Sequence, residues 1–221
     1  MTIIDVFHQV AQLRREDLFL DDRAMPITHR EDAKTAATGW VGPDYEAGSI
    51  VLVGVNPGGG GDGYRGNPTD AELYQRLRAF RDAKGNDRGA AFAALNDAWL
   101  SIQKTHSIWR VVVAVLNATG LRASQVAFMN MLPFRTREDK PAPVSVMASA
   151  WRLAAEPQIR VLAPAAIVSL GFKAGDALGK FADPKTIPPV FKIKRARGDM
   201  RIPDEARATL VELRDWMNAR R

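Results

Sequence analysis

A run of apolar residues that leads straight into a glycine-rich segment constrains this chain more than any other feature. Residues 50–53 and Val55 are apolar and mostly β-branched, which is typical of a strand buried on both faces. Glycine dominates residues 58–66, directly after it. Parallel α/β sheets bind ligands beyond the carboxyl ends of their strands, and glycine there lets backbone N–H groups approach a ligand closely. The pattern predicts a ligand-binding loop, with a flexible surface loop as the alternative.

Two well-known phosphate-binding loops do not fit this glycine-rich segment. Gly58, Gly60 and Gly63 satisfy the G-x-G-x-x-G spacing of dinucleotide-binding proteins, but four consecutive glycines meet that spacing by composition alone. The fingerprint also needs a helix that begins within the motif, whereas residues 64–69 are expected to be loop. A Walker A loop needs Lys-Ser/Thr after its last glycine, and Tyr64 stands there instead. Neither nucleotide-binding interpretation is favoured.

Length and composition indicate one α/β domain over residues 1–221, with 46% hydrophobic residues as in ordinary soluble proteins. No apolar run reaches the ~18 residues that could cross a membrane, and the N-terminus lacks the apolar core of a signal peptide. A cytoplasmic protein without a membrane partner is therefore expected. The chain has no cysteine and three scattered histidines, so disulfides, thiolate zinc sites and iron–sulfur clusters are excluded. Neither a metal nor another cofactor is expected.

Positive charge accumulates toward the end of the chain. The formal net charge is +6. A dense group of basic residues comprises Lys192, Lys194, Arg195, Arg197, Arg201 and Arg207. Such clusters are typical of proteins that bind a phosphate backbone, with a merely solvated basic face as the alternative.

Hydrophobic periodicity and turn signals predict strands that alternate with helices. Strands are expected over residues 50–55, 125–132, 165–170 and 189–195. Helices are expected over residues 3–19, 70–84, 89–104, 106–119, 144–162, 172–180 and 203–219, the fifth of them interrupted or kinked around Pro157. Residues 111–116 could instead form a strand. Residues 20–48 are expected to be an irregular lead-in anchored by Trp40 and Tyr45. Four strands that alternate with helices imply a parallel sheet covered on both faces.

Three separated motifs, in this order, resemble those of the uracil-DNA glycosylase superfamily. Residues 54–58, Gly-Val-Asn-Pro-Gly, resemble its water-positioning motif in the G-x-N-P-G form of the mismatch-specific and single-strand-selective branches. Asn130, with Pro133 three residues later, resembles the family's base-reading asparagine. Residues 161–174 are similar to its L-x-P-x-x-I-V-x-L-G-x-x-A element. The resemblance covers residues 49–220 and implies a three-layer αβα sandwich around a four-stranded parallel sheet.

One motif of that family is missing. A His-Pro-Ser or Asn-Pro-Ser turn should follow the last strand, but residues 194–200 read Lys-Arg-Ala-Arg-Gly-Asp-Met. The resemblance therefore implies the fold more strongly than it implies the excision of uracil. A larger modified pyrimidine, of the kind some phages use to mask their DNA, is an open alternative substrate. The lack of cysteine argues against the branches that carry an iron–sulfur cluster.

The resemblance assigns the water-activating step to the glycine-rich segment. Hydrolysis of an N-glycosidic bond passes through an oxocarbenium-like sugar and needs a positioned water. By resemblance, the amide of Asn56 orients that water, although an amide is a poor proton acceptor. Asp62 is the nearest carboxylate and could activate the water more strongly, or it could only form an Asx turn among the glycines.

The resemblance also implies a pocket for a flipped base. Asn130 can offer a donor and an acceptor to the Watson–Crick edge of a pyrimidine, or it could only cap a turn at the end of its strand. Tyr64 or Phe134 could stack on the base, unless each is only a packing residue. The loop that includes Gly54, Val55 and Gly58 would form one wall of this pocket.

A second loop, at residues 195–201, is expected to hold DNA. Its arginines, Arg195, Arg197 and Arg201, are suited to phosphate contacts, and Met200 could fill the gap left by the extruded nucleotide. Lys194, Arg195 or Arg197 could alternatively stabilise the departing base in place of the missing histidine.

Together these expectations describe a monomeric, monofunctional DNA N-glycosylase, a hydrolase that excises uracil or a modified pyrimidine. Its role would be base-excision repair or defence against phages with modified DNA. A DNA-binding module of the same fold without catalytic activity is the first alternative. An enzyme that uses the glycine-rich loop on a small phosphate or nucleotide is the second, and it would not depend on the basic cluster.

Overall fold

The computed structural model describes residues 1–19, 35–58, 68–136, 141–195 and 202–220. The helices are α1 (Ile3–Ala11), α2 (Arg15–Leu18), α3 (Pro68–Asp82), α4 (Asp87–Gln103), α5 (Trp109–Thr119), α6 (Val144–Ala150), α7 (Glu156–Leu162), α8 (Phe172–Phe181) and α9 (Asp204–Asn218). The strands are β1 (Trp40–Val41), β2 (Ile50–Gly54), β3 (Ala127–Asn130), β4 (Ala166–Leu170) and β5 (Val190–Ile193).

The strands form one mixed sheet in the order β1-β3-β2-β4-β5. The four strands β2 to β5 run parallel, so the α/β class and the predominantly parallel sheet are confirmed. Strand β2 lies between β3 and β4, and all five of its residues are buried. This placement explains the unbroken apolar run in the sequence, because both faces of a central parallel strand are covered.

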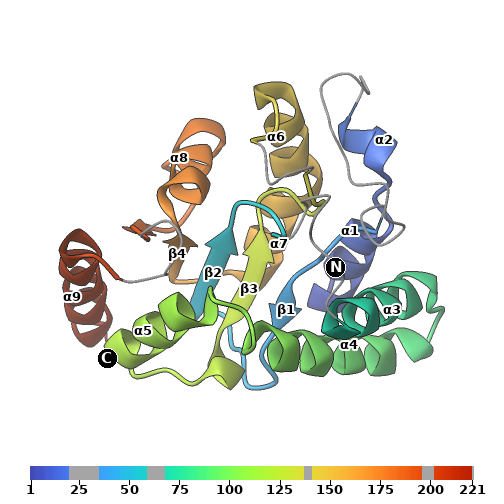
Figure 1. Ribbon diagram of the computed structural model, residues 1–221, viewed down its shortest axis with the longest axis horizontal. Coiled ribbons are helices and arrows are strands. Elements are labelled where there is room, and N and C mark those ends of the chain that lie inside the picture. Colours follow the sequence, from blue (N-terminus) through green and yellow to red (C-terminus); the bar gives the residue numbers. More distant parts are fainter. Residues whose placement is uncertain (20–34, 59–67, 137–140, 196–201, 221) are drawn as a thin grey trace.

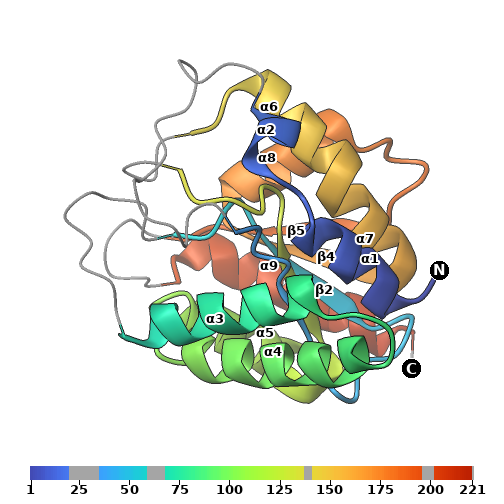
Figure 2. The same cartoon turned by 90° about the vertical axis from the view of Figure 1, so that its right-hand side faces the viewer.

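Helices lie on both sides of the sheet (Figure 1). Helices α6 and α8 lie on one side of it, and α4 and α5 lie on the other. Helix α9 packs against α5 and against the edge strand β5. Helix α1 contacts α7 as well as α3 and α4, so it joins the two helical layers beyond the β1 edge of the sheet (Figure 2).

The expectation of four strands is wrong, because a fifth strand lies within the segment taken for an irregular lead-in. Strand β1 has two residues and pairs antiparallel with β3, Trp40 opposite Phe128. Two residues are too few for an alternating pattern, so the sequence carries no strand signal there. Gly39, next to β1, has a φ of 85°, and a side chain at this position would overlap the Phe128 carbonyl.

Trp40 and Tyr45 are confirmed as aromatic anchors. The Trp40 side chain is fully buried, and its indole N–H donates a hydrogen bond to Oε1 of Gln103 in α4. The hydroxyl of Tyr45 donates to the carbonyl of Leu162 at 3.1 Å, and burial raises the pKa of this phenol above its usual range.

All the predicted helices are present, and the structure decides three details. The stretch 3–19 forms two helices, α1 and α2. Residues 111–116 belong to α5, which ends at Gly120 with a φ of 68°. The segment 144–162 stays helical throughout, and the predicted interruption near Pro157 is a π-helical stretch, Trp151–Ala155, that joins α6 to α7. Proline has no N–H for the regular ladder, which accounts for the irregular turn at this place.

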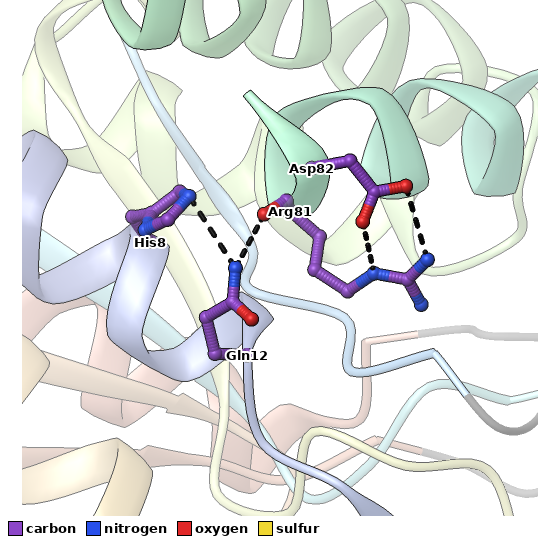
Figure 3. Close-up of polar contacts among 4 residues, drawn as sticks. All are labelled: His8, Gln12, Arg81 and Asp82. Carbon is purple, nitrogen blue, oxygen red and sulfur yellow. Dashed lines mark hydrogen bonds and ion pairs between the residues drawn. The ribbon is translucent and has the colours of Figure 1, made fainter. Parts of the chain in front are cut away.

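A side-chain contact ties α1 to the end of α3 (Figure 3). The Gln12 amide donates a hydrogen bond to the Arg81 carbonyl in the last turn of α3, and Nε2 of His8 lies 3.5 Å from the same amide nitrogen. Arg81 also binds both carboxylate oxygens of Asp82, at 2.8 and 3.1 Å, which raises the pKa of Arg81 and lowers that of Asp82. Carbonyls in a last turn have no intrahelical donor, so Gln12 supplies one.

We expect Gln12→Ala to lower the free energy of unfolding by about 1 kcal/mol, because it leaves this carbonyl without its donor. Chemical denaturation measures the change. Gln9→Ala is the matched control, since Gln9 is exposed on the same helix. Equal effects of the two substitutions would show that the contact between α1 and α3 adds nothing to stability.

Candidate functional site

The candidate site lies where the adjacent strands β2 and β3 end. The last residues of the two strands, Gly54 and Asn130, are partners in the parallel register. Backbone pairing continues beyond both strands, with Met131 N–H donating to the Gly54 carbonyl and Leu132 N–H donating to the Val55 carbonyl, each at 2.9 Å. The two predicted motif residues therefore lie at the carboxyl ends of neighbouring strands: Asn130 ends β3, and Asn56 follows β2.

The Asn130 side chain lies across Gly54. A β-carbon added to Gly54 would lie 2.5 Å from the Asn130 amide oxygen, so glycine leaves the space that this amide occupies. Asn130 is only 4% exposed, and its side-chain amide forms no hydrogen bond with any of the described residues. The amide nitrogen and oxygen of Asn130 are not among the fully enclosed polar atoms of the described residues, so this amide stays accessible to a water or a ligand.

We expect Gly54→Ala to force the Asn130 amide to rotate and to lower the free energy of unfolding by about 1–3 kcal/mol. The signals of the Asn130 side-chain amide in a nitrogen–proton NMR spectrum would move with it. Gly89→Ala in α4 is the control, because open space surrounds that glycine and alanine favours a helix. Unchanged Asn130 signals in Gly54→Ala would mean that the glycine is not needed for the placement of the amide.

Asn56 is half-buried in the segment after β2. Its Nδ2 donates a hydrogen bond to the hydroxyl oxygen of Thr136 at 3.1 Å. Thr136 is 1% exposed and belongs to the segment that follows β3. With the amide nitrogen held in this way, the carbonyl oxygen is the group of Asn56 that remains to accept a hydrogen bond from a ligand or a water.

Two residues of this region went unrecognised in the sequence. Besides Thr136, they include Arg135, which is 5% exposed and whose guanidinium carbon lies 5.0 Å from the ring centre of Tyr74 in α3. Arg135 therefore brings a buried positive charge into the segment after β3 and holds it against α3. Both residues lie close to Asn130 in the chain, which could have indicated that they belong to the site. No sequence motif, however, relates Thr136 to Asn56.

The other predicted pocket residues differ in their surroundings. Phe134 is fully buried, and its ring contacts that of Phe19 edge-on with centroids 6.0 Å apart, so it takes part in the core. Val55 is half-buried, and Gly58 is exposed with open space around it. Asp62 and Tyr64 lie outside the described residues.

The predicted DNA-binding residues lie partly at the same edge of the sheet. Arg195 is exposed after β5, and its Nε lies 3.2 Å from the place a β-carbon of Gly171 would take, directly after β4. Lys194 is ion-paired with Glu205 of α9 at 2.6 Å, so part of its charge is already compensated. Arg197, Met200 and Arg201 lie outside the described residues.

A separate cavity of about 250 Å³ lies at the opposite edge of the sheet. Its lining includes Trp151, Ile159, Pro164 and Pro188, and the two prolines directly precede the amino ends of β4 and β5. It shares no residue with the site formed by Asn56, Asn130 and Thr136.

In the part of the chain that the structure describes, no group of three or more His, Cys, Asp or Glu side chains could hold a metal ion. None of the described helices is both long enough and apolar enough to span a bilayer. Among the described residues, the side chains at the site are amides, a hydroxyl and guanidinium groups.

No protein-family model and no curated protein sequence matches this chain. The case for a function therefore rests on the residues at the carboxyl edge of the sheet, Gly54, Asn56, Asn130 and Thr136, and on the motifs that carry them.

Proposed function

We propose that the protein is a monofunctional DNA glycosylase, which flips uracil or a modified pyrimidine out of DNA and hydrolyses its N-glycosidic bond. The observation that carries this proposal is the Asn130 side-chain amide, which lies across Gly54 without a hydrogen-bond partner among the described residues, at the same edge of the sheet as the amide of Asn56. A pyrimidine offers a donor and an acceptor on one edge, and a single carboxamide is complementary to that pair.

The chemistry divides between the two amides. The carbonyl of Asn56 accepts a hydrogen bond from a water molecule and directs the water oxygen at C1′ of the sugar. A bond forms between this oxygen and C1′ while the bond from C1′ to N1 of the base breaks. Its electron pair leaves with the base, which takes up the proton that the water loses. Asn130 donates a hydrogen bond to the base and stabilises the charge that develops on it.

Charge supports DNA as the substrate. The net charge is +6, and Arg195 lies exposed at the same edge of the sheet as the two asparagines. A guanidinium at the rim of the site is suited to a phosphate of the strand that carries the flipped nucleotide. With a divergent segment in place of the histidine turn, uracil in repair and a bulkier pyrimidine in defence against phages are both candidate substrates.

The test is the release of free base from a panel of DNAs. Single- and double-stranded oligonucleotides would carry uracil, thymine mismatches, hydroxymethylated cytosine or glucosylated cytosine, and intact phage genomes would complete the panel. Mass spectrometry identifies the released base. We expect release from at least one substrate by the wild-type protein and not by Asn56→Ala protein purified in parallel, which controls for contaminating glycosylases.

Failure to release a base from any of these DNAs would contradict the proposal. Binding to duplex DNA that weakens steeply between low and physiological salt would then favour the DNA-binding module. Binding of free nucleotides, with no dependence on Arg195, would instead favour an enzyme for small phosphate compounds.

A further inference from the structure

A hydrogen bond links the two segments that leave the central strands. The donor, Nδ2 of Asn56, and the acceptor, Oγ1 of Thr136, are 80 residues apart in the chain and 3.1 Å apart in the structure. Asn56 is half-buried, whereas Thr136 is 1% exposed. One partner thus lies at the surface of the site and the other is enclosed beneath it.

The segment that carries Thr136 is held firmly. From Asn130 to Thr136 every residue is buried. The backbone N–H groups of Met131 and Leu132 donate to the segment after β2, and the carbonyl of Pro133 accepts a hydrogen bond from Ala37 N–H at 2.7 Å. Thr136 is therefore a fixed reference point for a neighbouring side chain.

Asn56 lacks such support of its own. Only the bond to Thr136 engages its side-chain amide among the described residues. A carboxamide on a free side chain samples several rotamers, and a displacement of about 1 Å is enough to cost two orders of magnitude in the rate of a reaction that depends on placement.

We propose that Thr136 is the positioning residue of this site: its hydroxyl holds the nitrogen end of the Asn56 amide, so that the carbonyl end faces the water that attacks C1′. This inference rests on the proposed glycosylase function. Thr136 does not touch the substrate or the water and acts only through Asn56.

Two substitutions distinguish the role of the Thr136 hydroxyl from the packing role of the rest of the side chain. Thr136→Val keeps the shape and removes the acceptor, and we expect it to lower kcat about tenfold with KM unchanged. Thr136→Ser keeps the hydroxyl and is expected to retain near wild-type kcat. A general loss of packing would affect both variants alike, so equal effects would overturn the proposal.

A double-mutant cycle shows whether Thr136 acts through Asn56. In the Asn56→Ala background, Thr136→Val is expected to cause no further loss in the residual rate of base release, because the side chain it positions is gone. A further tenfold loss would overturn the proposal, since Thr136 would then act on its own.

One measurement does not need activity at all. Exchange of the Asn56 side-chain amide protons with solvent, followed by NMR, is expected to be slower in the wild-type protein than exchange at exposed Asn86, and fast in Thr136→Val. Equally fast exchange at Asn56 and Asn86 in the wild type would overturn the positioning role even if Thr136→Val failed to fold. Slow exchange together with no base release from any DNA would contradict the glycosylase function and leave the hydrogen bond itself intact.

Discussion

Asn130→Leu is expected to abolish base release while leaving the free energy of unfolding nearly unchanged. Leucine has nearly the shape of asparagine, so it fits over Gly54, where the amide now lies. The Asn130 amide has no hydrogen-bond partner among the described residues and is not one of their fully enclosed polar groups, so its replacement by leucine breaks no protein hydrogen bond. Loss of both hydrogen bonds to the flipped base is expected to lower kcat/KM by about 10³-fold.

Asn96→Leu provides the matched comparison for the stability measurement. The side-chain oxygen of Asn96 in α4 accepts a hydrogen bond from Val41 N–H at 3.1 Å. Its loss is expected to decrease the free energy of unfolding by about 1 kcal/mol, whereas Asn130→Leu is expected to leave it nearly unchanged. If Asn130→Leu instead destabilised the protein, its amide would be a structural group and the proposed pocket would lose its main support.

Asn56→Ala is expected to decrease the single-turnover rate constant of base release by about 10²- to 10³-fold. The substitution removes the group that we propose orients the water but leaves the basic residues in place, so the affinity for DNA is expected to stay within about twofold of wild type. Rapid-quench measurement of released base, with enzyme in excess over DNA, isolates this step from product release.

Asn86→Ala is a suitable control for Asn56→Ala, because Asn86 is exposed and makes no side-chain cap for α4. We expect wild-type rates from that control. Wild-type rates from Asn56→Ala as well would place water activation elsewhere, with Asp62 as the nearest carboxylate in the sequence.

The sequence predicted the central part of the fold well, because local chemistry determines it. The apolar run of β2 and the glycine-rich residues after it could be recognised without any partner strand. Glycine after α5 and proline in the first turn of α7 mark a helix end and an irregular turn through their own backbone chemistry. Strand β1 was missed for the complementary reason: it is defined by pairing with β3, and its two residues carry no periodicity.

The site was predictable in part. Parallel strands end at one edge of a sheet, so residues after β2 and β3 could be expected there, but nothing in the sequence shows that these two strands are neighbours. Strand order decides that Gly54 faces Asn130. The bond between Asn56 and Thr136 joins segments 80 residues apart and depends on side-chain placement, which no motif encodes.

The two outer strands leave little room for another chain to join the sheet. Unpaired strand edges invite association between molecules, and short or charged edges discourage it. Strand β1 offers only two residues at one border. At the other border β5 includes Lys192, which pairs with Asp176 at 2.9 Å, and helix α9 packs against this strand. The apolar centre of the sheet is thus bordered by strands that make poor templates for aggregation.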